Sequence, residues 1–113
     1  MIDLETLLTL ISEALNMRPE DIRSKSMRND LNNARSLFIH FAQLEKRGRQ
    51  EIIDAINMTS KSAVNYHVKR VADLVITDKA MRESYAKCSA QIKYYRGNKN
   101  RRKDSGVVAV FVR

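Results

Sequence analysis

Four polar residues near the middle of the chain are of the types that read DNA bases. Ser60, Lys61 and Ser62 are consecutive, and Asn65 follows at the spacing of one helical turn. At the start of the second helix of a helix–turn–helix, such side chains reach base edges in the major groove. Lysine donates to guanine O6 and N7, serine serves either base type, and asparagine pairs with adenine N6 and N7. We therefore expect base contacts from these residues, with helix capping alone as the alternative for Ser60 and a solvated surface position as the alternative for Asn65.

Basic residues gather in two further places. Lys25 and Arg28 flank a polar joint, where basic loop residues often hold phosphates. The segment from Lys93 to Lys103 sets Tyr94 and Tyr95 beside a group of further cations. These are Arg96, Lys99, Arg101, Arg102 and Lys103. Such a mixture suits phosphate contact with base stacking, as in single-strand binding; a solvated tail or a linker is the alternative.

The chain lacks the pattern of a catalytic or metal site. His40 and His67 are the two histidines, and neither has further ligands at metal-binding spacing. Cys88 is a lone cysteine at an inner helix position, which is typical of a small apolar core residue. No Gly-rich phosphate loop is present. We expect no enzyme, no metal, no cofactor and no bound nucleotide.

The charge balance favours a polyanionic partner. The 113 residues include 21 Lys+Arg and 13 Asp+Glu, which gives a net charge of +8. Nucleic acid or an anionic membrane fits this excess, and a generic solubilising surface is the alternative. No segment reaches transmembrane length, and Asp3 and Glu5 stand where a signal peptide needs positive charge. We expect a cytoplasmic, nucleoid-associated protein without membrane contact.

The spacing of apolar residues predicts an all-α bundle of five to six helices. The expected helices cover about 4–15, 19–22, 28–46, 50–56, 60–75 and 78–94. Asp3 and Asp78 (or its neighbour Thr77) are the expected N-caps, and Asn57 is the best candidate for a left-handed residue in the central turn. Leu44 would extend the inner stripe of the long helix.

The last 21 residues differ in composition from the rest. We expect Gly97 and Asn98 to end the final helix, so that residues 1–92 form the domain and 93–113 a basic tail. The tail ends in Val107 to Val112, a run typical of a short β-strand. Because a lone strand exposes unpaired backbone groups, we expect it to pair with its counterpart in a homodimer. Pairing with Tyr94 and Tyr95 or packing on the helices are the alternatives.

Three blocks of sequence resemble the C-terminal duplex-binding domain of the bacterial replication initiator DnaA, which belongs to a Trp-repressor-like helical superfamily. The blocks are SEALNMRPEDIRSKSMR, NNARSLFIHFAQLE and EIIDAINMTSKSAV. They occur in the family's order, and the third aligns without a gap on the helix–turn–helix signature EIGxxFGGRDHTTV. The resemblance covers about Leu7 to Ile92.

The resemblance also suggests roles for further residues. Arg35 matches the arginine of an Ala-Arg pair that reaches the minor groove in the family, with an intrahelical ion pair or exposure to water as the alternative. Tyr66, Lys69 and Arg70 match positions near the DNA backbone, although the last two are adjacent and point about 100° apart. Thr59 takes the first place of the family's base-reading Arg-Asp-His run.

Two departures limit what the resemblance implies. Asn57 and Met58 replace the Gly-Gly of the turn, and Thr59, Ser60 and Lys61 replace Arg-Asp-His, so the family's binding-site sequence does not carry over. The family's ATP-binding module has no counterpart. We expect a non-catalytic double-stranded DNA-binding protein, in replication initiation or in transcription control of a mobile element or phage. A protein-interaction module that keeps only the fold, or a single-strand or RNA binder using the tail, are the alternatives.

Overall fold

Six helices account for most of the described chain. The computed structural model describes residues 2–26, 28–58 and 62–104, and the side chains of Ser62 and of residues 98–104 are not described. The helices are α1 (Leu4–Ala14), α2 (Pro19–Arg23), α3 (Asn29–Leu44), α4 (Arg49–Ala55), α5 (Ser62–Thr77) and α6 (Lys79–Asp104). The predicted all-α architecture is confirmed over these ranges, which contain no strand. The predicted strand, Val107 to Val112, lies outside them.

The helices begin and end largely through local side-chain chemistry. The carboxylate of Asp3 accepts from the Thr6 amide at 2.8 Å, and that of Asp78 accepts from the Ala80 amide at 3.0 Å. Both expected caps are therefore confirmed. Pro19 is the first residue of α2, where its missing amide proton removes no helical bond.

Three helices end in the same way, with a left-handed residue after the last turn. Asn16, Lys46 and Asn57 have φ of 58°, 62° and 58°. After each, the next amide reaches back to the fifth residue before it, as Met58 does to the Ile53 carbonyl at 2.9 Å. This pattern satisfies carbonyls that a helix end would leave unpaired. The left-handed Asn57 was predicted, whereas Lys46 was not, because lysine has no special preference for this conformation.

The core is built around α3, which packs against α1, α2, α5 and α6. Its fully buried residues include Leu37, Phe38 and Ile39. The expectation that Leu44 extends this inner face was wrong, because its side chain is 60% exposed. Glu45, one turn after Phe41, takes the buried position instead, and its carboxylate accepts from the Ile2 amide at 3.0 Å.

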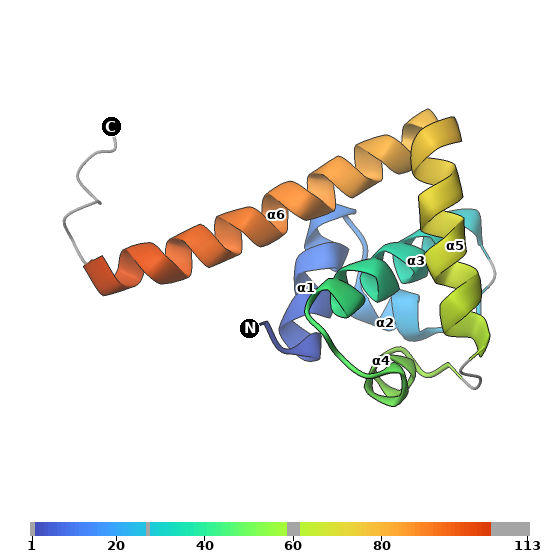
Figure 1. Cartoon of the computed structure of the whole chain (residues 1–113), viewed down its shortest axis with the longest axis horizontal. Coiled ribbons are helices and arrows are strands. Elements are labelled where there is room, and N and C mark those ends of the chain that lie inside the picture. Colours follow the sequence, from blue (N-terminus) through green and yellow to red (C-terminus); the bar gives the residue numbers. More distant parts are fainter. Residues whose placement is uncertain (1, 27, 59–61, 105–113) are drawn as a thin grey trace.

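The last helix is longer than predicted. Instead of ending near Gly97 and Asn98, α6 continues to Asp104 and extends beyond the body of the molecule (Figure 1). Its first part is anchored in the core by Met81, Cys88 and Ile92. A single glycine in a helix costs only about 1 kcal/mol relative to alanine, and the Arg and Lys residues that follow are good helix formers. The segment predicted to be a tail is therefore helical up to Asp104.

In the described part of the chain, the helices are too short or too polar to cross a bilayer.

Candidate nucleic-acid interface

Helices α4 and α5 are the two helices expected for the helix–turn–helix, and residues 59–61 of the segment between them lie outside the described residues. The amide of Gly48, just before α4, donates to the Glu51 carboxylate at 2.9 Å, which closes the first turn. Ile52, Ile53 and Ile56 are buried and fix α4 to the core. Asn57, with a φ of 58°, follows the end of α4. In Figure 1, α5 lies at the right of the body and α4 below it, both away from the outer end of α6.

Helix α5 has one buried face and one exposed face. Val64, His67 and Val71 are buried, and the most extensive helix pairing in the molecule is that of α5 with α3. Asn65 and Lys69 are exposed, and Tyr66 is 56% exposed. The first half of the helix thus leaves the polar side chains of Asn65 and Lys69 exposed, as a groove-reading helix requires.

The residues expected to begin this helix are only partly described. Thr59, Ser60 and Lys61 lie outside the described residues. Ser62 is the first residue of α5, and its side chain is not described. Asn65 is the one expected base-reading residue whose contacts are known. Its amide oxygen accepts from Nη2 of Arg49, the first residue of α4, at 3.0 Å.

Two residues expected near the DNA backbone, Lys69 and Arg70, take different directions. Lys69 is exposed, whereas Arg70 is half-buried and turns back toward α3. There its guanidinium donates to the amide oxygens of Asn33 and Asn29. Both residues help to line a shallow surface hollow of about 280 Å³, together with Tyr66, Asp73 and Leu74. Arg70 is therefore held at the edge of this hollow by the neutral side chains of Asn33 and Asn29.

His67 supports the buried face of α5. Its Nδ1 lies 2.6 Å from the hydroxyl of Ser36 on α3. Burial, reinforced by the positive charges of Arg70 and Arg35, lowers the pKa of His67 to about 4. The imidazole is neutral at physiological pH, so it packs α5 against α3 without adding to the surface charge.

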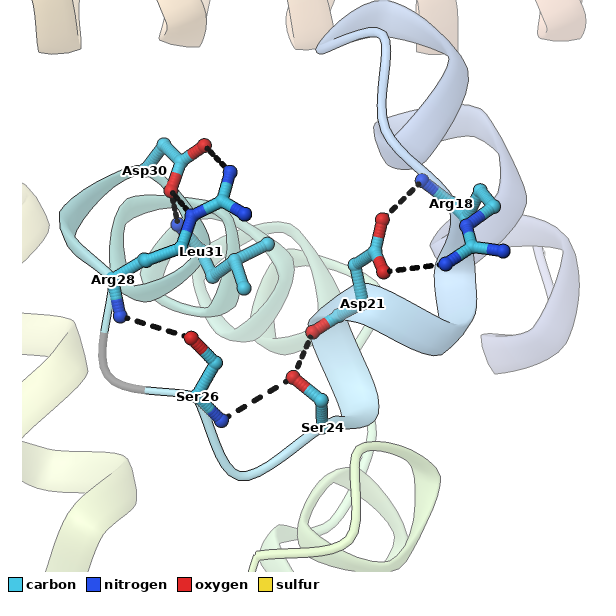
Figure 2. A network of polar contacts seen from close by, with 7 residues as sticks. All are labelled: Arg18, Asp21, Ser24, Ser26, Arg28, Asp30 and Leu31. Carbon is cyan, nitrogen blue, oxygen red and sulfur yellow. Dashed lines mark hydrogen bonds and ion pairs between the residues drawn. The ribbon is translucent and has the colours of Figure 1, made fainter.

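The joint between α2 and α3 is ordered by its own side chains, as Figure 2 shows. The Ser24 hydroxyl donates to the Asp21 carbonyl at 2.7 Å and accepts from the Ser26 amide at 3.3 Å. Arg28 forms a two-point ion pair with Asp30, with its shorter N–O distance at 2.7 Å. Lys25 is exposed. Lys25 and Arg28 were both expected to contact phosphate. Of the two, Arg28 already has its charge balanced by Asp30.

Arg35 does not occupy the position expected of a minor-groove contact. Its side chain is 94% buried, and its guanidinium donates to the carbonyls of Ile22, Ser24 and Ser26 at 2.7–2.8 Å. Both alternatives, an intrahelical ion pair and exposure to water, also fail. The cause lies in the tertiary structure, because the three carbonyls point inward toward Arg35. A guanidinium has five N–H donors, so it can satisfy all three from one position.

The expected basic tail is the outer part of α6. Tyr94 is 65% exposed and Lys93 is exposed. Arg96 forms an ion pair with the largely buried carboxylate of Glu45, which ties α6 to the end of α3. The side chains of Lys99, Arg101, Arg102 and Lys103 are not described, although their backbone is helical.

The described residues contain no cluster of three or more His, Cys, Asp or Glu side chains that could hold a metal ion. Cys88 is fully buried, and burial raises the pKa of its thiol to about 12. A thiol in this state is a poor nucleophile.

Sequence reasoning missed the three polar partners Arg49, Asn29 and Asn33. Arg49 begins a helix and was counted only as general positive charge. Asn29 and Asn33 are one turn apart on α3, a spacing that marks one helix face. That spacing was the only sequence signal, and it does not reveal that Arg70 crosses from another helix to reach them.

Comparison with known proteins identifies similar sequences in one group of proteins. The chain is 33% identical over 75 residues to the chromosomal replication initiator protein DnaA of Campylobacter concisus, and 32% identical over 75 residues to that of Campylobacter curvus. It is 27% identical over 78 residues to DnaA of Campylobacter fetus. These matches cover 66–68% of this chain and 17–18% of each relative. The chain therefore spans less than a fifth of the length of the relatives that it matches.

No protein-family model matches the chain, and no solved structure matches it significantly. The similarity to three DnaA proteins agrees with the resemblance found in the three sequence blocks and with the all-helical fold. The chain is therefore similar in sequence to a part of DnaA, in agreement with its resemblance to the C-terminal domain of that family.

Proposed function

We propose that this chain binds double-stranded DNA through the α4–α5 helix–turn–helix. The observation that carries the proposal is the division of α5 into two faces. Val64, His67 and Val71 are buried against the body, whereas Asn65 and Lys69 are left exposed. A helix held firmly along one side and polar along the other is suited to insertion in the major groove.

The described cations around α5 would hold the DNA backbone. Lys69 is exposed on the helix itself, and Arg70 is fixed at its edge by Asn29 and Asn33. Lys25 is exposed in the α2–α3 joint, whose Ser24 and Ser26 carbonyls are bonded to Arg35 of α3. Phosphate contacts of this kind set the register of the protein on the duplex. Base reading would fall to Ser60, Lys61, Ser62 and Asn65, and Thr59 and Tyr66 would lie at the edge of the groove.

The biological setting we propose is replication initiation, since the relatives are named as chromosomal replication initiators. A role in transcription control of a mobile element or phage would use the same contacts. The chain matches a small part of each relative, so the proposal concerns DNA binding alone.

A binding selection from randomised duplex DNA, followed by titration of the selected site at several salt concentrations, tests the proposal. Neutralising about four to seven phosphates should give a slope of log K against log[salt] of about −4 to −6. The selected duplex should also be preferred over random duplex. Absence of duplex binding at low salt, or a flat salt response, would favour a protein-interaction module instead.

A second candidate, single-strand or RNA binding, is favoured by the outer part of α6. Tyr94 is 65% exposed beside the exposed Lys93, as a stacking site next to a phosphate contact would be. Tyr94→Ala should weaken binding to single strands without changing binding to duplex. If single-stranded oligonucleotides bind no better than a neutral polymer, this candidate fails.

Homodimerisation through Val107 to Val112 is a separate proposal. Two copies would present two recognition helices to a two-fold symmetric site. The solution mass of the full chain should then exceed that of a truncation ending at Asp104 by a factor of about two, as two-fold association requires. Equal masses at high protein concentration would exclude the strand-mediated dimer.

A further inference from the structure

Arg49 and Asn65 join the two helices of the helix–turn–helix through exposed side chains. Nη2 of Arg49 donates to Oδ1 of Asn65 at 3.0 Å, across 16 residues of sequence. Both residues are exposed, so their remaining polar groups face solvent. Because a guanidinium has donors only, the amide oxygen of Asn65 must be the atom that faces it. In this arrangement the amide directs its oxygen toward Arg49 and its NH₂ group away from it.

This orientation changes what Asn65 can recognise. A free asparagine pairs with adenine by accepting from N6 and donating to N7. Here one lone pair of the accepting oxygen is already bonded to the positive guanidinium of Arg49. The second lone pair of the oxygen is free, but a donor brought to it would approach beside a cation. What remains well placed is the NH₂ group of Asn65 together with the unused donors of Arg49.

An edge made only of donors matches guanine. In the major groove, guanine presents two acceptors, O6 and N7, whereas adenine presents one acceptor and one donor. We propose that Arg49 and Asn65 act together as one specificity-determining unit that selects a guanine, with Arg49 as a reading residue contributed by the first helix of the motif. This inference rests on the proposed duplex binding by α5.

Because the two side chains are bonded to each other, substitution of either one should change the base preference at the same position of the DNA. Single-base changes in the selected duplex should identify one guanine whose replacement by adenine weakens binding by about 5- to 150-fold, the range of a good base contact. Arg49→Ala should remove this preference or shift it toward adenine, since it frees the amide oxygen. Asn65→Ala should remove it, and the double variant should lose no more discrimination than either single variant.

Gln50→Ala is the matched control. Gln50 is the exposed neighbour of Arg49 on α4 and is bonded to Asp54 within the same helix. Its loss should leave the guanine preference unchanged. Thermal unfolding followed by circular dichroism should show that all four variants fold like the parent chain, because every side chain removed is exposed.

The outcomes separate this inference from the function on which it rests. If the parent chain binds no duplex, the proposed function fails, and this inference fails with it. If the chain binds a selected site in which Asn65 recognises adenine, or in which no base depends on Arg49, duplex binding stands and the guanine-selecting unit is overturned. Equal weakening of selected and random duplex by Arg49→Ala would also overturn it, because Arg49 would then be a phosphate contact.

Discussion

The α2–α3 joint and the outer face of α5 both carry arginines, but they use them in different ways. Beneath the joint, Arg35 of α3 is buried and bonded to the backbone carbonyls of Ile22, Ser24 and Ser26. On α5, Arg70 reaches the side-chain amides of Asn29 and Asn33 at the surface, and Lys69 projects from the helix. The first arrangement determines how the chain folds. The second leaves positive charge where a phosphate could approach.

The comparison shows that the bonding partner of a basic side chain indicates its role, in folding or in binding, better than its place in the sequence does. Backbone carbonyls in the interior cannot be exchanged for phosphate without unfolding the joint. Amide partners at the surface can be exchanged at little cost, because both groups can also bond to water. Arg35 should therefore affect stability, and Lys69 should affect binding.

The largest effect should come from Arg35→Ala. The change leaves three carbonyls without their donor and removes a buried side chain, so we expect a loss of about 3–5 kcal/mol in the free energy of unfolding. Urea denaturation followed by circular dichroism measures it. Arg35→Lys should recover only part of this loss, since one ammonium cannot reproduce the guanidinium fork.

Arg28→Ala is the matched control in the same joint. Its ion pair with Asp30 is exposed, so the denaturation midpoint should hardly change. If Arg28→Ala and Arg35→Ala destabilise the protein equally, the distinction between buried and surface arginines is wrong.

The next effect should be a loss of stability in acid caused by His67. The folded pKa is about 4, whereas an unfolded histidine titrates near 6.5. Between these values the unfolded chain binds the proton more readily than the folded chain. The contribution of neutral His67 to the free energy of unfolding is therefore complete above about pH 6.5 and is lost as the pH falls toward 4. The free energy of unfolding should fall by roughly 2–3 kcal/mol over this window.

His67→Asn should reduce this pH dependence, because asparagine can bond to Ser36 without titrating. His40 has a pKa lowered by burial and acts in the same direction, so some dependence should remain. A stability curve that is flat from pH 6.5 to 4 in the parent chain would show that His67 is not buried as neutral imidazole.

A smaller effect should follow from Lys69→Ala. Because the side chain is exposed, stability should not change, whereas duplex affinity should fall several-fold. Loss of one phosphate contact should also make the salt slope shallower by about 1. Fluorescence anisotropy at three salt concentrations measures both quantities. An unchanged slope would mean that Lys69 touches no phosphate.

The smallest effect should come from Arg96→Ala, since Arg96 is intermediate between the buried Arg35 and the exposed cations of the surface. Its guanidinium is about half exposed but pairs with the largely buried Glu45. We expect a loss of about 0.5–1 kcal/mol in the free energy of unfolding. Hydrogen exchange should report faster opening of the C-terminal part of α6, and equal exchange in both proteins would mean that the pair does not hold this helix.

Local signals predicted most of the fold. The caps at Asp3 and Asp78, the proline that begins α2 and the left-handed Asn57 each depend on one or two neighbouring residues. The continuation of α6 past Gly97 was not predicted, because a glycine–asparagine pair is a weak stop signal when good helix formers follow it.

The site was predicted less completely than the fold. The division of α5 into two faces followed from its periodicity. The role of Arg35 did not, because the three carbonyls that hold it come from residues 9–13 positions earlier in the chain. The bonds of Arg49 to Asn65 and of Arg70 to α3 connect different helices, and periodicity within one helix carries no information on such pairs.

The proposal that the exposed face of α5 holds duplex DNA is tested most directly by reversing one charge on that face and one elsewhere. Lys69→Glu changes the exposed side of α5, and Lys87→Glu makes the same change at an exposed position of α6. Duplex affinity should be measured by fluorescence anisotropy at low and at near-physiological salt. We expect Lys69→Glu to weaken binding at least tenfold more than Lys87→Glu at low salt, with the difference shrinking as salt rises. Equal affinities of the two variants at low salt would contradict the account.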